Sequence, residues 1–461
     1  MKNNICIMKK SILGFMLFVV CFGINNLTAQ NIYTYAGNGG AVFSGDGGQA
    51  TSAELYYPQG VCVDDSGNVY IADNNNAVRK VDHVTGIITT VAGTGVGGIS
   101  PDGGQATASP IIQPLAVAVD DSGNIYFSET ANNKIRMVVK KTGVLTTVAG
   151  SGNYGYNGDG GQATAAEIFY PYGLAVDAAH NIYFADEDNY RIRKVTHSTG
   201  IITTLAGNGT MGYNNDGIQA TAAELNYPTG VALDATGNVY ISDYGNQRVR
   251  MVDISSGLIS TFAGNGTPGS SGDGTQATTA ELNYPAGVAF DGSGDLFIAD
   301  EHNQKVREID GITGVITTVA GNGYLSGGFS GDGGLATLAE LWWDYSVTVD
   351  KSGNLFIADA NNNRIREVKG ISTSVSNISQ PNQIEIYPNP VSDRLYINGI
   401  KQSSAVKLYT LSGQIIWVGK CSSNNSKMEI PVNNLLTGIY FLEVLSPDGQ
   451  RTVTKVDVIR N

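Results

Sequence analysis

The chain has 461 residues, of which 59 are glycine and only 15% are charged. This composition disfavours helical bundles and disordered chains and favours many short strands joined by turns. The formal charge of −13 disfavours anionic partners such as nucleic acid.

The N-terminal segment has the pattern of a secretory signal peptide. Lysines 2, 9 and 10 precede an apolar run of 14 residues from Ser11 to Ile24, and Leu27-Thr28-Ala29 stands before Gln30. A membrane anchor is the alternative, but a helix of that length spans about 21 Å, short of a bilayer core of ~30 Å. We therefore expect residues 1–29 to be removed, which leaves no transmembrane segment in the mature chain. Losing three of 28 basic residues and none of 41 acidic ones moves the formal charge from −13 to −16.

Residues 31–370 repeat a unit of 56 or 57 residues, in which the dipeptide Ala-Gly recurs at positions 36, 92, 149, 206, 263 and 320. One unit reads Pro171–Asp177, Asn181–Asp186, Arg191–Val195 and Gly200–Ala206. These are β-branched or aromatic runs between turn residues. Six units of four antiparallel strands predict an all-β fold, a six-bladed β-propeller over residues 30–370.

The two ends of the repeat region complement each other. The last unit has strands around Val347–Asp350, Leu355–Asp359 and Arg364–Val368 but no fourth, whereas residues 31–36 read as a fourth strand without the first three. An open ring would expose a strand edge. We therefore expect residues 31–36 to close blade 6.

Three motifs, Pro-x-Gly-Val-Ala-x-Asp, Gly-Asn-Val-Tyr-Ile-Ala-Asp and Asn-x-Arg-Ile-Arg-x-Val, together resemble the NHL repeat over roughly 340 residues. The resemblance implies a six-bladed propeller. Because the family includes protein binders, RNA binders and a few lyases, its fold does not settle the function. The sequence departs from the shorter family repeat between the fourth strand of one blade and the first strand of the next, where each unit carries about twenty residues, as in Gly150 to Pro171.

Each of these inserts has a glycine-rich loop with one aspartate, at positions 46, 102, 159, 216, 273 and 332. One carboxylate per loop is too few for calcium, which needs ~6 to 8 oxygens, so we expect Asp-turn hydrogen bonds instead of metal. Threonine and glutamate follow at capping-box spacing and predict one helical turn per blade. The pairs are Thr51 and Glu54, Thr164 and Glu167, Thr221 and Glu224, Thr278 and Glu281, and Thr337 and Glu340.

Two charged residues recur in every blade. An acid ends the second strand, at Asp73, Glu129, Asp186, Asp243, Asp300 and Asp359. An arginine recurs in the third strand, at Arg79, Arg136, Arg193, Arg250, Arg307 and Arg366. Their matched presence predicts a structural ion pair, since one partner of a partly buried pair is costly to remove.

Aromatic residues precede the first strand in five blades, whereas blade 2 has Ile112 and Gln113. The innermost strands line the channel of a propeller, so these side chains could rim its mouth, where aromatic rings stack on sugars or clasp peptides. Packing between blades is the alternative. Blade 6 replaces the usual Tyr-Pro-x-Gly with Trp342-Trp343-Asp344-Tyr345-Ser346. The predicted ligand-binding residues are Trp342, Trp343, Asp344, Tyr345, Tyr56, Tyr57, Tyr170, Tyr227 and Tyr284.

Catalysis has little support in the sequence. The four histidines are expected not to converge, with His83, His180 and His197 in turns on one face and His302 in a loop on the other. No Ser-His-Asp order or zinc-ligand spacing occurs. We therefore predict no catalytic residue, metal ligand or cofactor.

Residues 371–383 have the Ser, Asn, Gln and Pro content of a linker, and residues 384–461 read as a small β-sandwich of Ig-like type. This last part resembles the type A sorting domain of the type IX secretion system of Bacteroidetes. The resemblance rests on strand motifs and on Tyr387, Pro388, Asn389, Pro390, Gly413, Gly438 and Tyr440. It implies that the type IX machinery exports the chain across the outer membrane, to the medium or the cell surface.

Together these features predict a secreted or cell-surface binding or adhesion protein whose propeller recognises a glycan or peptide ligand. An extracellular propeller enzyme of lyase or lactonase type is the alternative. RNA binding fits neither the acidic surface nor the export signals.

Overall fold

The computed structural model describes residues 30–370 and, further on, residues 385–387, 391–398, 404–410, 415–421, 427–445 and 451–459. The predicted signal peptide, the linker and the motif residues Pro388, Asn389, Pro390 and Gly413 lie outside the described residues. The chain divides into two compact units, Met1–Ser374 and Val375–Asn461. No helix of the described residues is long and apolar enough to cross a membrane.

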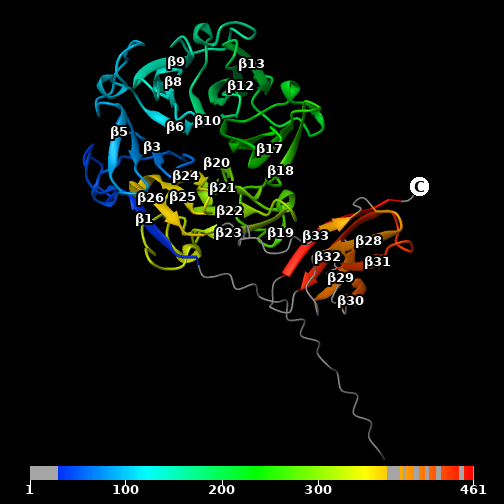
Figure 1. Cartoon of the computed structure of the whole chain (residues 1–461). Coiled ribbons are helices and arrows are strands. Elements are labelled where there is room, and N and C mark those ends of the chain that lie inside the picture. The colour runs from blue at the N-terminus through cyan, green and yellow to red at the C-terminus, as the bar shows by residue number, and fades with distance from the viewer. Residues whose placement is uncertain are drawn as a thin grey trace, which may run out of the picture. The chain divides into compact units, whose positions relative to one another are not determined.

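The first unit is a six-bladed β-propeller, as predicted, whose antiparallel sheets follow one another around a ring (Figure 1). Blade 1 comprises β2 (Gly60–Val63), β3 (Val69–Asp73), β4 (Ala77–Val81) and β5 (Ile88–Gly93). Blade 2 comprises β6 (Pro114–Val119), β7 (Ile125–Glu129), β8 (Lys134–Val139) and β9 (Val144–Ala149). Blade 3 comprises β10 (Pro171–Val176), β11 (Ile182–Asp186), β12 (Arg191–Thr196) and β13 (Ile201–Ala206).

Blades 4 and 5 repeat this order and add a two-residue edge strand. Blade 4 comprises β15 (Pro228–Leu233), β16 (Val239–Asp243), β17 (Arg248–Asp253), β18 (Leu258–Ala263) and β14 (Ile218–Gln219); blade 5, β20 (Pro285–Phe290), β21 (Leu296–Asp300), β22 (Lys305–Ile309), β23 (Val315–Ala320) and β19 (Thr275–Gln276).

Blade 6 is assembled from both ends of the repeat region. Its sheet contains β24 (Asp344–Val349), β25 (Leu355–Asp359), β26 (Arg364–Val368) and β1 (Ile32–Ala36). β1 pairs antiparallel with β26, from Ile32 opposite Val368 to Ala36 opposite Ile365. The innermost strands also form a closed series, in which β24 of blade 6 lies beside β2 of blade 1. Ring closure therefore depends on a strand that is more than 300 residues from its partner in sequence.

Glycine in the Pro-x-Gly motif lets neighbouring innermost strands approach closely. A Cβ atom on Gly173 of blade 3 would lie 2.3 Å from the carbonyl oxygen of Thr229 in blade 4, and one on Gly230 would lie 2.3 Å from the carbonyl oxygen of Ala286 in blade 5. A side chain at Gly173 or Gly230 would therefore have to displace the neighbouring strand. Blades 2 and 6 instead carry Ala116 and Ser346 at the same position.

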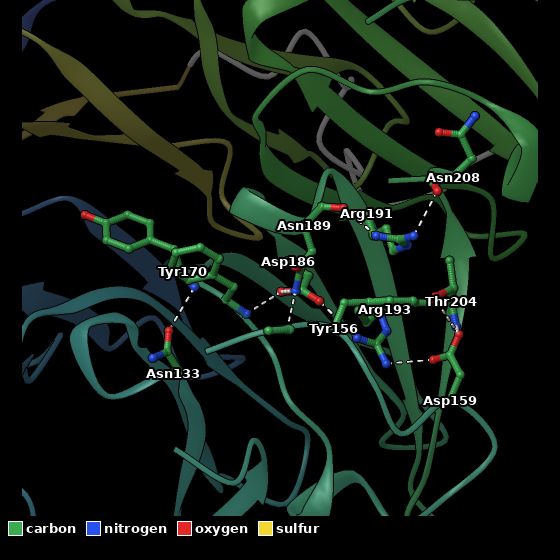
Figure 2. A network of polar contacts seen from close by, with 12 residues as sticks. Asn133, Tyr156, Asp159, Tyr170, Asp186, Asn189, Arg191, Arg193, Thr204 and Asn208 are labelled. Carbon is green, nitrogen blue, oxygen red and sulfur yellow. Dashed lines mark hydrogen bonds and ion pairs between the residues drawn. The ribbon is translucent and has the colours of Figure 1, made fainter. Parts of the chain in front are cut away.

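A buried arginine in every blade lies between two carboxylates, as Figure 2 shows for blade 3. Arg193 donates to the strand acid Asp186 at 2.9 Å and to the loop aspartate Asp159 at 2.7 Å. Arg193 and Asp186 are fully buried. The same two ion pairs recur around Arg79, Arg136, Arg250, Arg307 and Arg366. The predicted pairing of strand acid and arginine is confirmed.

The loop aspartates have a different role from the one predicted. Asp159 accepts from the Tyr156 hydroxyl of its own loop, at 2.9 Å, but also from the Arg193 guanidinium and, at 3.1 Å, from the backbone N–H of Thr204 in the fourth strand. The insert is long enough to fold back over its own blade, so its carboxylate reaches the third and fourth strands. Each loop aspartate therefore fastens an insert to a blade.

The predicted helical turn is present in each insert, but the capping box is wrong. The turns are short 3-10 turns at Ala50–Ser52, Ala106–Ala108, Ala163–Ala165, Ala220–Ala222, Ala277–Thr279 and Ala336–Leu338. In the first, Gln49 occupies the N-cap position without a side-chain cap, and Thr51 lies inside the turn. The turn therefore begins two residues too early for Thr51 to cap it. Glu54 accepts instead from the N–H of Val42, at 2.9 Å.

The second unit is a β-sandwich, as predicted. One sheet has the order β27 (Glu385–Tyr387), β28 (Arg394–Asn398), β31 (Lys427–Pro431), and the other β30 (Ile415–Lys420), β29 (Ala405–Thr410), β32 (Gly438–Leu445), β33 (Arg451–Val458). Residues of both sheets, among them Leu395, Ile430, Leu408, Leu442 and Val456, form one buried apolar cluster. Of the described motif residues, Tyr387 stacks on Tyr396, Tyr440 donates to the carbonyl of Leu436 at 2.9 Å, and Gly438 begins β32.

Candidate functional site at the channel mouth

The innermost strands of the six blades line a central channel that holds two cavities. One, of about 350 Å³, is lined by residues within these strands, such as Val63, Val119 and Phe290. The other, of about 210 Å³, lies where the strands begin. The loops between second and third strands also reach this end, so the smaller cavity has the more varied lining. We refer to this smaller cavity as the mouth cavity.

The mouth cavity combines carboxyl, phenol and amide groups. Its lining residues are Gln59, Leu115, Tyr170, Tyr172, Glu187, Thr229, Tyr244, Ala286, Glu301 and Tyr345. Glu187, Tyr244 and Glu301 are each the first residue of a 3-10 turn between second and third strands, at Glu187–Asn189, Tyr244–Asn246 and Glu301–Asn303. Tyr172 and Tyr345 are each the second residue of a first strand. The carboxyl and hydroxyl groups of the cavity therefore come from equivalent positions in several blades.

Glu301 is a buried carboxyl group whose basic neighbour is His302, with the Nε2 atom 3.5 Å from Oε1; burial lowers the pKa of His302. The Glu301 side chain is 1% exposed, and its Oε2 atom is buried without a hydrogen-bond partner. Burial raises the pKa of Glu301 to about 8, although hydrogen bonding from Tyr244 and Tyr345 partly offsets this. The carboxyl group is therefore largely protonated near neutral pH, which is unusual for a glutamate.

Glu187, from blade 3, resembles Glu301 of blade 5. Its Oε2 atom is also buried without a hydrogen-bond partner. Burial, followed by the nearby charge of Asp188, raises the pKa of Glu187 to about 8. No lysine or arginine is among the described residues that line the cavity. Two carboxyl groups thus face one cavity that has no lysine or arginine in its described lining to pair with their charged forms.

Hydroxyl groups of the mouth cavity are linked across the channel. The Tyr172 hydroxyl of blade 3 donates to Oε1 of Gln59 in blade 1, at 2.8 Å. The hydroxyls of Tyr57 and Tyr345 lie 2.9 Å apart. Because these bonds join different blades, they hold the rings in defined positions before any ligand binds.

An aromatic cluster extends from the cavity over blades 4, 5, 6 and 1. The Trp343 ring lies 6.3 Å from both Tyr57 and Tyr345 and stacks at 6.5 Å on His302, measured between centroids. His302 in turn lies 4.4 Å from Tyr284, which lies 4.7 Å from Tyr244. His302 was not predicted to take part, but it stands next to Glu301 and completes the cluster.

The residue before the first strand has the same unusual backbone in every blade. Tyr57, Gln113, Tyr170, Tyr227, Tyr284 and Trp343 have φ between 47° and 56°. Such left-handed backbone costs roughly 1 kcal/mol or more for a residue other than glycine. In five blades the N–H donates to a side-chain amide of the preceding blade, as Figure 2 shows for Tyr170 and Asn133, which are 3.0 Å apart. The strained backbone is therefore part of the contact between blades.

The predicted binding residues occupy five kinds of position. Tyr170 and Tyr345 line the mouth cavity, and Tyr57, Tyr284 and Trp343 belong to the aromatic cluster. Tyr227 contacts Tyr190 instead. Tyr56 and Trp342 stand one residue earlier in the chain, where their N–H groups donate to the strand acid of their own blade, and Asp344 is completely buried.

Sequence reasoning missed Glu187, Glu301, Tyr172, Tyr244 and Gln59. A signal for them exists in the repeat itself. In blades 1 to 6, the residue after the strand acid is Asn74, Thr130, Glu187, Tyr244, Glu301 and Ala360 in turn. The residue after the position of the motif proline is Gln59, Leu115, Tyr172, Thr229, Ala286 and Tyr345 in turn. Both positions vary within an otherwise regular unit, which is typical of residues that do not serve the fold.

The other end of the strands carries a second polar group, around His180. Its Nδ1 atom lies 3.1 Å from Asp120 and its Nε2 atom 3.6 Å from Asp121, and its ring lies 5.3 Å from that of His197. The four histidines do not meet at one point: His180 and His197 lie together on the face where both were expected, and His302 lies in the aromatic cluster at the other end of the channel. Asp120 already accepts from Asn124 and Tyr126, as Asp64 accepts from Asn68 and Tyr70 in blade 1, so its role is that of a hairpin turn.

Comparison with protein families agrees with this architecture. The Teneurin NHL domain matches residues 38–101 and 154–215, and the NHL repeat matches residues 225–250 and 282–309. The first unit is therefore an NHL-repeat β-propeller. The secretion system C-terminal sorting domain matches residues 385–459. The chain is thus an NHL-repeat propeller protein with a type IX sorting domain, and it is exported to the medium or the cell surface.

Two relatives illustrate how widely the repeats occur. Protein SUPPRESSOR OF QUENCHING 1 of Arabidopsis thaliana is 29% identical over 275 residues, which are 57% of this chain and 26% of the relative. Teneurin-1 of Homo sapiens is 27% identical over 404 residues, which are 76% of this chain and 13% of the relative. The matched region spans only about an eighth to a quarter of these relatives.

Two solved structures are similar in fold. A structural genomics protein of unknown function from Bacteroides thetaiotaomicron has a TM-score of 0.54 at 20% identity, covering 74% of this chain and 76% of that one. An auxiliary nutrient binding protein from the same organism has a TM-score of 0.52 at 16% identity, covering 73% and 75%. At these identities the similarity concerns the fold alone.

Proposed function

We propose that this exported protein is a binding or adhesion protein whose propeller recognises a glycan or a peptide at the mouth cavity. One observation carries the proposal: two carboxyl groups and four tyrosine rings converge on a single cavity, and both carboxyl groups have a buried oxygen without a partner. Polar groups that are buried and unpaired inside a protein are costly, so a fold that keeps two in one cavity favours a ligand that pairs with them.

A lyase or lactonase remains the second candidate. The raised pKa of Glu187 and Glu301 favours it, because a carboxyl group that titrates near neutral pH can act as a general acid or base. The enzyme would be favoured over the binding protein if the protein turns over a substrate and the change of either glutamate to glutamine abolishes that turnover.

The proposal is tested by screening the purified full chain on glycan and peptide arrays, followed by measurement of the affinity for the ligand found. Trp343→Ala is expected to weaken that affinity by roughly 1 to 3 kcal/mol, because one ring of the cluster is lost. Tyr154→Ala is the matched control, since Tyr154 is an aromatic residue of an insert that is 73% exposed; it should bind as the parent does.

Melting temperatures separate binding from packing in this experiment. The 36% exposed ring of Trp343 should contribute little to stability. If Trp343→Ala lowers the melting temperature sharply, or leaves the affinity unchanged, the ligand does not bind at this rim.

A further inference from the structure

We infer that the group anchored in the mouth cavity is an organic cation, the ammonium or guanidinium of a peptide lysine or arginine, held between Glu187 and Glu301. This inference rests on the proposed function and selects the peptide over the neutral glycan. It concerns only the part of the ligand that enters the cavity. The rest of the peptide would contact the aromatic cluster.

The contrast with the six strand acids carries the argument. Each strand acid, although fully buried, has an arginine nitrogen 2.8–3.4 Å away. Glu187 and Glu301 start the turns that directly follow two of these acids, yet they have no such partner. A buried carboxylate without a cation is strongly destabilising. In the empty protein a proton neutralises each group, and a cationic ligand would replace that proton as the counter-charge.

The tyrosine rings favour an organic cation in the same place. Tyr170, Tyr172, Tyr244 and Tyr345 line the cavity together with the two glutamates. The face of an aromatic ring attracts ammonium and guanidinium groups within ≈ 6 Å, most strongly where water is excluded. A volume of about 210 Å³ accommodates the end of one side chain and excludes a folded partner.

A metal ion fits this cavity less well. Among the described residues, the group of three metal-ligating side chains that comes together is Asp120, Asp121 and His180, at the other end of the strands. Glu187 and Glu301 belong to no such group. Two carboxyl groups that share a cavity with four tyrosine rings suit a ligand with several N–H donors.

The charge state of the two glutamates makes the binding depend on pH. Each has a pKa of about 8 in the empty protein, so below that pH a proton must leave before an ion pair forms. A lysine side chain stays charged up to pH ~10. The affinity for a cation should therefore strengthen as the pH rises from 6 to 8. The other titratable groups near Glu187 are Asp188, Tyr170, Tyr172 and Tyr190. Those near Glu301 are His302, Asp344, Tyr57, Tyr172, Tyr244 and Tyr345.

The test is calorimetric titration of the full chain with Nα-acetyl-lysine amide and Nα-acetyl-arginine amide. Nα-acetyl-norleucine amide, which has a similar length and no charge, and a methyl glycoside serve as neutral probes. The cationic probes should bind at least about tenfold more tightly than norleucine, as expected for one charged hydrogen bond. This comparison needs no variant, so it does not depend on how a mutant folds.

Variants then locate the binding. Glu187→Gln and Glu301→Gln, which keep the shape of the side chain, should each weaken the cationic probes about tenfold, and the double variant should lose the dependence on pH. Asp65→Asn is the control, because Asp65 is an exposed acid paired with Lys351 on the surface, 2.9 Å away; it should leave the affinity unchanged.

The outcomes distinguish the inference from the proposed function. If norleucine amide binds as tightly as lysine amide, or if folded Glu301→Gln binds the cations normally, the inference is overturned. If the glycoside alone binds and Trp343→Ala weakens it, the inference fails while the proposed function stands. If no probe and no array ligand binds, the proposed function fails as well.

Discussion

Deletion of residues 31–36 is expected to lower the melting temperature of the propeller by about 10 °C or more. Ile32 and Ala36 are completely buried in β1, and removing one large buried aliphatic side chain already costs about 2–5 kcal/mol. The deletion also leaves the edge of β26 unpaired and breaks the contact of the N-terminal segment with the insert of blade 6, where the N–H of Ile32 donates to Gly334 at 3.0 Å. In a chain of this size each kcal/mol shifts the melting temperature by roughly 2 °C.

Differential scanning calorimetry of the full chain measures this effect. Tyr33→Ala is the matched control, because Tyr33 lies in the same strand and is 39% exposed; its melting temperature should stay within about 1 °C of the parent's. A deletion variant with the parent's melting temperature would show that the ring does not depend on β1.

Arg193→Met is expected to destabilise blade 3 by about 3–5 kcal/mol, because it leaves the carboxylate of Asp186 buried without a counter-charge. It also removes one of the bonds that hold Asp159, and with it part of the attachment of the insert of blade 3. The control is Arg191→Met in the same strand, where the guanidinium donates to the backbone carbonyls of Asn189 and Asn208 (Figure 2). That variant should lose no more than about half as much stability.

Urea unfolding of both variants gives the comparison. Equal losses for Arg193→Met and Arg191→Met would mean that the buried ion pairs contribute nothing particular to the blades. Because the network recurs in all six blades, the result from blade 3 applies to each of them.

The architecture could be predicted because it is repeated. A unit of 56 or 57 residues leaves little freedom in strand number, and the missing fourth strand of the last unit pointed to residues 31–36, which pair with β26. The pairing of Asp186 with Arg193 could be predicted for the same reason. The second carboxylate, Asp159, could not, since nothing local shows that the insert returns to the third strand.

The mouth cavity could be predicted only in part. Aromatic residues before the first strands pointed to the end of the channel where the mouth cavity lies, and Tyr170 and Tyr345 line that cavity. Glu187 and Glu301 escaped notice because each stands in a short turn that looks like an ordinary loop in the sequence. They are more than 100 residues apart, and only the closed ring turns both toward one cavity. The same holds for Tyr172 and Gln59, whose hydrogen bond crosses the channel.

A crystal structure of the full chain with the ligand identified on the arrays would locate the binding site. We expect ligand density in the mouth cavity, with a ligand group within hydrogen-bond distance of Glu187 or Glu301 and a second contact to the ring of Tyr345 or Trp343. Density at the other end of the channel near His180, or on the outer edge of a blade with the mouth cavity unchanged, would contradict this expectation.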